Sequence, residues 1–291
     1  MEAFVDLKMR FLILSIASVI VGLIIGFAQN IVVQFVITCL IATLGAIAIW
    51  EYVKILKIKG ICLPFWLLGI ISVVYIFANY LSTVNGTFQI TVSGVVGVFF
   101  FAIFFYNFYK IDGAIINIAT SFFGTLYIIV PLGLLIKILY PNTMNPLLHD
   151  GRLWVVYLIS VTKVTDMGGY FVGKLWGKMR LAPHISPSKT VLGGIAGFFS
   201  AICLSLIFYL ISMWFELIAF RLSFIEAVIL GGLLGLFSQL GDLAESLLKR
   251  DAKIKDSNRI PGIGGVLDSL DSLLFTIPIL YLFLKASGSW L

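Results

Sequence analysis

Long apolar runs follow one another along almost the whole chain. They cover residues 11–28, 31–50, 61–81, 87–107, 114–140, 153–173, 191–213, 226–248 and 270–287. An α-helix needs about 20 apolar residues to cross the hydrocarbon layer of a membrane. The runs lack the alternating pattern of membrane β-barrel strands. We therefore predict an all-α integral membrane protein, a polytopic bundle of about nine transmembrane helices.

The fifth run, 114–140, is longer than one membrane crossing requires, and it contains Pro131. Proline has no backbone N–H and clashes with the preceding helical turn. A helix that exceeds the membrane thickness is accommodated by tilting or kinking. We therefore expect this helix to tilt or to break at Pro131.

The composition agrees with a membrane protein. Hydrophobic residues make up 60% of the sequence, charged residues make up 12%, and the mean hydropathy is +1.09. Because soluble domains carry about 25% charged residues, an ordinary soluble domain is excluded.

Basic residues concentrate in alternate loops. One side of the predicted membrane carries Lys8, Arg10, Lys54, Lys57, Lys59, Lys110, Lys174, Lys178, Arg180, Lys189, Lys249, Arg250, Lys253, Lys255 and Arg259. The other side carries Arg152, Arg221 and Lys285. Because basic loops remain in the cytoplasm, we place the N-terminus in the cytoplasm and the C-terminus outside. This predicts a multi-pass protein of the cell inner (plasma) membrane, with its active site facing the cytoplasm.

The net charge of +6 narrows the class of partner. The positive charge lies on the loops predicted to be cytoplasmic, which favours anionic membrane lipids or a phosphorylated substrate as partners. Nucleic acid is not expected as a partner. The sequence has two histidines, no HExxH motif, and three isolated cysteines, Cys39, Cys62 and Cys203. Any metal would therefore be held by carboxylates, which favours a hard cation such as Mg²⁺.

The two halves of the chain differ in polarity. We interpret residues 1–113, with spans one to four, as a transmembrane scaffold. Residues 114–291 contain spans five to nine and two long cytoplasmic loops, 174–190 and 249–269, so we expect the chemistry there. In the first half, the Glu51–Tyr52 pair stands out at the end of span two. We interpret it as an interfacial anchor, because tyrosine is typical of the aromatic belt.

Three carboxylates lie in or beside the last two spans. Asp242 falls inside span eight and shares a helix face with Lys249. Asp268 and Asp271 are three residues apart at the start of span nine, near the positive end of the helix dipole. A structural explanation is a lysine pair for Asp242 and helix capping for the other two. The alternative is a three-carboxylate Mg²⁺ cage completed by substrate phosphates and water.

Two loops contain groups that bind anions. The glycine-rich segment 261–265 can present backbone N–H groups to an anion. Five basic residues precede it: Lys249, Arg250, Lys253, Lys255 and Arg259. Before span seven, two hydroxyls and a lysine form either a phosphate site or an ordinary helix start: Ser186, Lys189 and Thr190.

Span six carries Lys163 and Asp166 on one face. The two charges neutralise each other in the simplest interpretation, and Asp166 is also a candidate active-site residue. Small residues spaced by four allow helices to approach closely. Such glycines occur at 169, 173 and 177, and the pairs Gly193/Gly197 and Gly231/Gly235 permit a homodimer without requiring one.

These motifs, in this order, resemble the phosphatidate cytidylyltransferase (CDP-diacylglycerol synthase) family. The C-terminal signature of that family reads approximately S-x-x-K-R-x4-K-D, followed by P-G-H-G-G-x-x-D-R-x-D. The matching residues are Ser246, Lys249, Arg250, Lys255, Asp256, Pro261, Gly262, Gly264, Gly265, Asp268 and Asp271. Elements at 166–173 and 186–190 are also similar to family motifs. The spacer after Asp256 is one residue short, Ile263 replaces histidine, and Ser269 replaces arginine.

The resemblance implies transfer of CMP from CTP to phosphatidic acid, which gives CDP-diacylglycerol and pyrophosphate for phospholipid biosynthesis. It implies Mg²⁺ as cofactor, with room for a second, monovalent cation. We assign metal binding to Asp242, Asp268 and Asp271, and triphosphate or pyrophosphate binding to Lys249, Arg250, Lys255 and Arg259. We assign binding of lipid phosphate or nucleotide to Ser186, Lys189 and Thr190. Asp166 and Asp256 are candidate active-site residues without an assigned role.

Other functions remain open from the sequence. A CTP-dependent lipid kinase would release CDP rather than pyrophosphate, and an ether-lipid cytidylyltransferase would accept a different lipid phosphate. An ion-coupled transporter would use Asp166, Lys163 and Asp242 as a relay. The absence of internal repeats and the crowding of polar residues at the cytoplasmic face argue against transport.

Overall fold

The computed structural model describes residues 26–84, 89–109, 111–141, 150–215, 217, 219–254 and 265–287. The first predicted span lies almost entirely outside the described residues. Three predicted site residues also lie outside them, namely Lys255, Asp256 and Arg259. The same holds for most of the glycine-rich segment 261–265 and for the chain ends, on which the predicted orientation of the termini depends.

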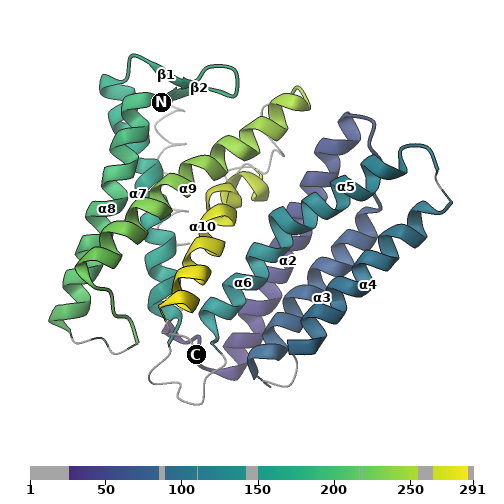
Figure 1. Ribbon diagram of the computed structural model, residues 1–291, viewed down its shortest axis with the longest axis horizontal. Helices are drawn as coiled ribbons and strands as arrows, with labels where there is room; N and C mark the ends of the chain where they lie inside the picture. The colour runs from purple at the N-terminus through teal and green to yellow at the C-terminus, as the bar shows by residue number, and fades with distance from the viewer. Residues whose placement is uncertain are drawn as a thin grey trace, which may run out of the picture.

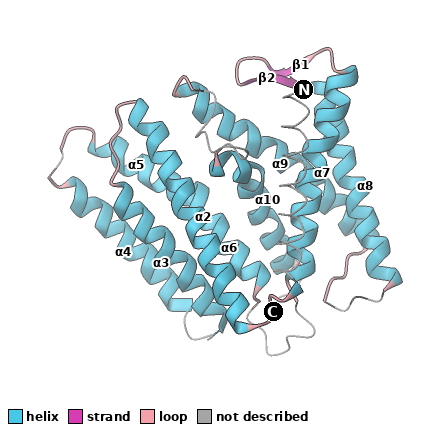
Figure 2. Cartoon of the chain, turned by 180° about the vertical axis from the view of Figure 1, so that it is seen from behind, coloured by secondary structure: helices cyan, strands magenta, loops and turns pink. Residues whose placement is uncertain are grey.

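Helices form nearly all of the described structure (Figures 1 and 2). They are α2 (Ile31–Ile58), α3 (Phe65–Val84), α4 (Gln89–Asn107), α5 (Ala114–Gly124), α6 (Val130–Leu139), α7 (Arg152–Trp176), α8 (Val191–Trp214), α9 (Phe224–Asp251) and α10 (Val266–Ala286). Figure 1 shows α2 to α6 as one group and α7 to α9 as another, with α10 between them.

Six helices of the described chain are long and apolar enough to cross a membrane. They are Ile31–Ile58, Phe65–Val84, Ala114–Leu139, Val191–Trp214, Phe224–Asp251 and Val266–Ala286. A shorter apolar helix covers Val92–Asn107. Helix α7 forms where the sixth span is predicted, but it carries Lys163 and Asp166 near its middle and is not among the six. The prediction of a helical membrane protein is thus confirmed, whereas the count of nine spans and the orientation of the termini stay predictions.

A π-helical turn interrupts the fifth predicted span. Thr125–Ile129 forms this turn between α5 and α6, and Val130 N–H reaches back to the carbonyl of Thr125. Pro131 follows within the first turn of α6, where its missing N–H costs least. The irregularity expected at Pro131 therefore takes the form of a wider turn directly before it.

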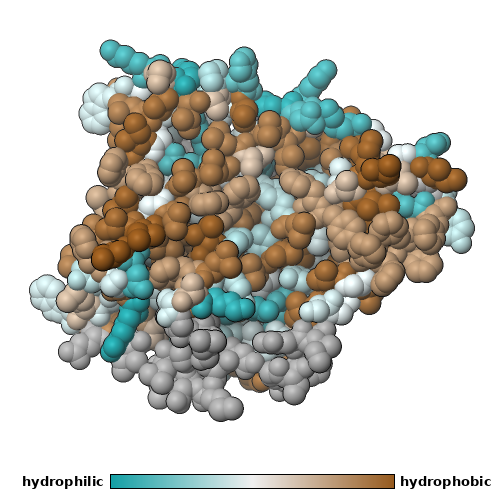
Figure 3. All heavy atoms as spheres, in the orientation of Figure 1, coloured by the Kyte–Doolittle hydropathy of each residue, from teal (hydrophilic) through white to brown (hydrophobic). Residues whose placement is uncertain are grey.

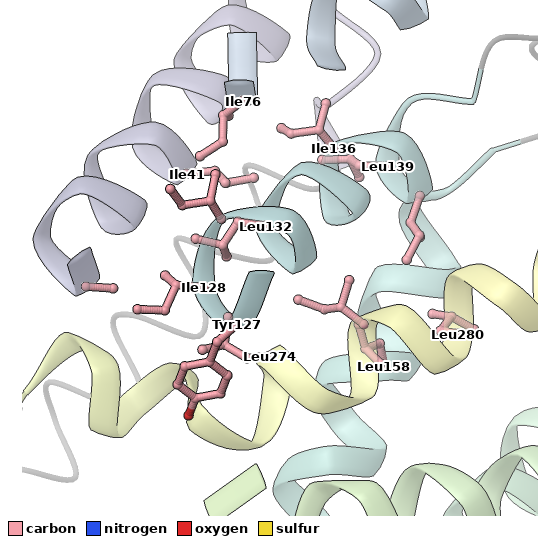
Figure 4. Packing of buried hydrophobic residues seen from close by; sticks show 14 of the residues in the cluster. Ile41, Ile76, Tyr127, Ile128, Leu132, Ile136, Leu139, Leu158, Leu274 and Leu280 are labelled. Atoms are coloured by element: carbon pink, nitrogen blue, oxygen red, sulfur yellow. The ribbon is translucent and has the colours of Figure 1, made fainter. Parts of the chain in front are cut away.

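Helix α6 and the π-helical turn before it connect the two helix groups through the apolar core. In Figure 4, Ile128 and Leu132 lie near Ile41, while Tyr127 lies near Leu274 of α10. The ring of Tyr127 also meets Phe275 edge-on, with ring centroids 6.0 Å apart. On the face seen in Figure 3, apolar atoms form a broad band, with hydrophilic atoms along the upper edge and others below the band.

Glycines bring α7, α8 and α9 into close contact. A Cβ at Gly193 of α8 would lie 2.6 Å from the carbonyl oxygen of Gly169 in α7, and one at Gly197 would lie 2.7 Å from that of Thr165. On the other side of α8, a Cβ at Gly235 would lie 2.7 Å from Ala201. The close approach predicted for the glycines of span six is confirmed. The spacings that permit a homodimer serve packing within this chain, and dimerisation stays a prediction.

The loop between α7 and α8 contains a small antiparallel sheet that the all-α prediction does not include. Strand β1 (Arg180–Ala182) pairs with β2 (Ser186–Thr190), with Arg180 opposite Thr190 and Ala182 opposite Ser186. Thr190 ends β2 and also caps α8, because its hydroxyl accepts a hydrogen bond from Gly193 N–H at 3.2 Å. The hairpin therefore leads directly into the first turn of α8.

Candidate active site

Three segments far apart in the sequence meet at one end of the molecule, at the top of Figure 1. Arg250, near the end of α9, donates to the carbonyl of Ile185 in the hairpin at 3.1 Å and to that of Ile254 at 3.2 Å. Lys59, just after α2, pairs with Asp251 at 3.0 Å. These contacts bring the hairpin, the end of α9 and the end of α2 together.

A cavity of about 750 Å³ lies beneath the hairpin, between α7, α8 and α9. Four predicted site residues line it: Asp166, Lys189, Thr190 and Asp242. Other polar residues that line it were not selected as site residues in the sequence analysis, and they include Lys174, Arg180 and Gln239. The cavity thus combines carboxylates with several cations, a mixture suited to a metal ion and phosphate groups together.

Two carboxylates of the cavity are held by neighbouring helices. Asp242 Oδ2 pairs with Lys189 Nζ at 2.5 Å, and Asp242 Oδ1 accepts from the Ser246 hydroxyl at 3.4 Å. Asp166 Oδ1 accepts from the Ser238 hydroxyl at 3.5 Å. Lys163 attracts Asp166 electrostatically, so the predicted compensation between these two charges is present.

A glycine places Asp271 beside Asp242. A Cβ at Gly241 would lie 2.5 Å from the carbonyl oxygen of Asp271 and 3.0 Å from Ser272 Cα, so α9 and α10 touch backbone to backbone there. Asp271 is buried, and both Asp242 and Asp166 repel it electrostatically. Carboxylates from three helices thus lie near enough to repel one another, and a bound cation would relieve that repulsion. Asp166, Asp242 and Lys189 line the cavity, and the buried Asp271 lies behind Asp242. We call these four residues the cavity group.

A second set of charges lies further along α9. Lys249 Nζ pairs with Asp268 Oδ1 at 2.7 Å and with the fully buried carboxylate of Glu245. Asp268 Oδ2 also accepts from Gly265 N–H at 3.2 Å. The helix-capping role considered for Asp268 is thus present. We call Glu245, Lys249 and Asp268 the buried group.

The structure brings together only part of the predicted site. Asp271 lies beside Asp242 and near Asp166, while Asp268 belongs to the buried group. Arg250 bonds to backbone carbonyls, Thr190 caps α8, and Ser186 begins β2. The assignment of these residues to substrates stays a prediction.

The interpretation of Glu51 and Tyr52 as an interfacial anchor is wrong. Both side chains are buried, with 0% and 1% exposure. Glu51 accepts hydrogen bonds from the first N–H groups of α10, and the Tyr52 hydroxyl donates to the carbonyl of Thr120 at 2.8 Å. The sequence signal was present, since a carboxylate in an apolar run is costly without partners. The partners could not be seen in the sequence, because they lie far away along the chain.

The chemistry of the cavity group fits a hard divalent cation. Mg²⁺ commonly takes one or two protein carboxylates and fills its remaining positions with phosphate oxygens and water. Among the described residues, no three Asp, Glu, His or Cys side chains lie close enough together to hold one ion. Asp242 and Asp271 would be the two carboxylates that such an ion takes. That Asp268 joins them around one ion stays a prediction.

Comparison with known proteins identifies the family of this chain. Residues 9–287 match the profile of the cytidylyltransferase family. Phosphatidate cytidylyltransferase of Bacillus subtilis is 32% identical over 290 residues, which cover 96% of this chain and 98% of the relative. The proteins of the same name from Chlamydia pneumoniae and Chlamydia trachomatis are 40% and 44% identical, over 61% and 60% of this chain. Those two matches span 57% of each chlamydial protein. The match over nearly the full length shows that this chain belongs to the cytidylyltransferase family.

Proposed function

We propose that this protein is a phosphatidate cytidylyltransferase, which transfers CMP from CTP to phosphatidic acid at a membrane. The observation that carries the proposal is the cavity of about 750 Å³, which carboxylates and cations line together. The name and nearly complete coverage of the Bacillus subtilis relative support it.

The reaction places particular demands on the site. An oxygen of the lipid phosphate attacks the α-phosphorus of CTP, the bond from that phosphorus to the bridging oxygen breaks, and pyrophosphate leaves. The attacking oxygen is already an anion, so no base is needed to generate it. The main barriers are repulsion between anions and the alignment of a soluble substrate with a membrane-bound one.

Basic residues around the cavity would bind the phosphates. Lys174 and Arg180 line it without being among the predicted residues, and Lys189 lines it while paired with Asp242. A phosphate group that took over Lys189 would leave Asp242 free for a cation. Lys249 is paired with two carboxylates, so its predicted contact with triphosphate would require those pairs to open.

Mg²⁺ is part of the proposal. Asp242 and Asp271 are the residues that would hold it, with Asp166 nearby and Asp268 as the third predicted ligand. When bound, the ion would neutralise phosphate charge in the transition state. The protein itself would orient the two phosphates and limit access of water from beneath the hairpin.

The arrangement of helices supports a site at a membrane surface. The hairpin and the end of α9 lie at the same end of the molecule, beyond the apolar band of Figure 3. The basic residues Lys59, Lys174 and Lys189 belong to this end. We propose that it faces the cytoplasm of a cell whose inner membrane holds the protein.

The test is pyrophosphate release by detergent-purified protein given phosphatidic acid, CTP and Mg²⁺, with each omitted in turn. We expect release only when all three are present. Release of CDP with a lipid alcohol would instead identify a kinase, and a preference for an ether-lipid phosphate would identify the other cytidylyltransferase considered. Folded protein without any nucleotide chemistry would contradict the proposal.

A further inference from the structure

A buried glutamate of α2 holds the first turn of α10. Glu51 Oε1 accepts from the N–H of Val266 at 3.1 Å, and Oε2 accepts from the N–H of Leu267 at 2.8 Å. The first N–H groups of a helix have no partner within that helix. Glu51 supplies partners for two of them from 215 residues away, and its side chain is fully buried.

The neighbouring Tyr52 fixes the same turn of α2 on its other side. Its hydroxyl donates to the carbonyl of Thr120, and its ring occupies the space above Gly124, where any Cβ would overlap it. The turn of α2 that carries Glu51 is therefore held by α5 at Thr120 and Gly124. Because Glu51 in turn holds α10, the first helix group sets the position of a helix that bears two candidate site residues.

The first turns of α10 carry an acid of each charged group. Asp268 follows Leu267 directly, and Asp271 lies about one helical turn after it. Because Glu51 binds the N–H groups of Val266 and Leu267, Asp268 caps only Gly265 and keeps its other oxygen on Lys249. The close contact at Gly241 then fixes Asp271 beside Asp242.

We propose that Glu51 is a positioning residue for the reaction: its two hydrogen bonds hold α10 so that Asp271 faces Asp242 and Asp268 remains with Lys249. This inference rests on the proposed function. Without the Glu51 carboxylate, the positive end of α10 loses its compensating charge. Asp268 is the nearest acid to replace it, and its movement would disturb the buried group and the adjacent turn.

The chain offers a matched control for loss of a helix cap. Glu226 begins α9, and its Oε2 accepts from the N–H of Ser223 at 2.8 Å. It lies at the opposite end of α9 from Asp242 and the buried group. The variants are therefore Glu51→Gln, the shorter Glu51→Asp, and Glu226→Gln. For each, the measurements are thermal unfolding, amide hydrogen exchange of the peptide covering 266–271, and kcat and KM from pyrophosphate release.

For Glu51→Gln we expect faster exchange in this peptide and a kcat lowered about tenfold or more, since misplacement by roughly 1 Å can cost about a hundredfold. The KM for phosphatidic acid should stay within about twofold, because no lipid contact is removed. For Glu51→Asp, the exchange rate of this peptide and kcat should lie between those of Glu51→Gln and of the wild type. Glu226→Gln should retain wild-type kinetics and wild-type exchange at 266–271, whatever its effect on stability.

A folded Glu51→Gln protein with wild-type kcat would overturn the inference, as would an equal loss of kcat in Glu226→Gln. If Glu51→Gln does not fold, Glu51→Asp takes its place in the test: a folded Glu51→Asp protein with wild-type kcat would overturn the inference. Wild-type protein that releases no pyrophosphate would instead overturn the proposed function. The two failures are therefore distinguishable.

Discussion

The cavity group and the buried group use the same residue types in different surroundings. Each places one lysine among carboxylates on α9 and α10. In the cavity group, the side chains of Lys189 and Asp242 are 23% and 32% exposed. In the buried group, those of Lys249 and Glu245 are 13% and 0% exposed, and that of Asp268, at its edge, is 24% exposed. Charges that border a cavity can exchange partners with a ligand, whereas sealed charges mainly join helices, because leaving one of them unpaired is costly.

The strongest test of this difference is Asp271→Asn in the cavity group. We expect turnover to fall more than about a thousandfold, because a metal ion held by carboxylates supplies several kcal/mol of transition-state stabilisation. The unfolding temperature should not fall, since the substitution removes a repelled charge. Pyrophosphate release and thermal unfolding in detergent check the two parts. Near-normal turnover would show that the cavity group does not carry the chemistry.

The same substitution made in each group sharpens the comparison. Lys249→Met leaves Glu245 and Asp268 without their shared lysine, so we expect a loss of about 3 kcal/mol in the free energy of unfolding. Adding Glu245→Gln to this variant should restore part of the loss. Denaturant unfolding of the single and double variants measures both. A stable single variant would show that the buried group does not hold the helices.

Lys189→Met is the counterpart in the cavity group. Its pair with Asp242 is partly exposed, so we expect the free energy of unfolding to change by less than about 1 kcal/mol. The value of kcat/KM for CTP or for phosphatidic acid should fall about tenfold, since a charged hydrogen bond to phosphate is lost. Separate titrations of the two substrates identify which phosphate Lys189 binds. A loss of stability equal to that of Lys249→Met would remove the distinction between the groups.

The smallest expected effect concerns Tyr127, which lies near both groups. Its hydroxyl is buried and has no hydrogen-bond partner among the described residues. Tyr127→Phe should therefore leave the free energy of unfolding unchanged or raise it by up to about 1 kcal/mol. Thermal unfolding with and without CTP measures this. Destabilisation would show that the hydroxyl has a partner, and a weaker shift by CTP would show that the partner is the substrate.

The sequence was sufficient to predict features that depend on local spacing. Apolar runs located the helices, and glycines spaced by four located the contact between α7 and α8. The sequence also placed Asp242 and Asp271 in one candidate site, and the backbone contact at Gly241 brings α9 and α10 together there. These predictions hold because a helix fixes which residues share a face.

Features that depend on distant contacts could not be predicted. The bond from Glu51 to α10 requires knowledge of which helices are neighbours. The separation of Asp268 from Asp271 depends on the rotation of α10, which the backbone contact at Gly241 fixes. The strands of the hairpin are only three and five residues long, and segment 180–190 lacks the alternating apolar pattern of a strand.

The π-helical turn at Thr125–Ile129 gives the fifth span one residue more than an α-helix of the same number of turns. One residue corresponds to about 100° of rotation around the helix axis. Deleting Leu126 would therefore restore a regular α-helix but change the rotational position of α5 relative to α6. With α6 held in the core, α5 would rotate and carry Gly124 away from the ring of Tyr52. A larger side chain would then face that ring. The extra residue in the π-helical turn therefore sets which residues of α5 face α2.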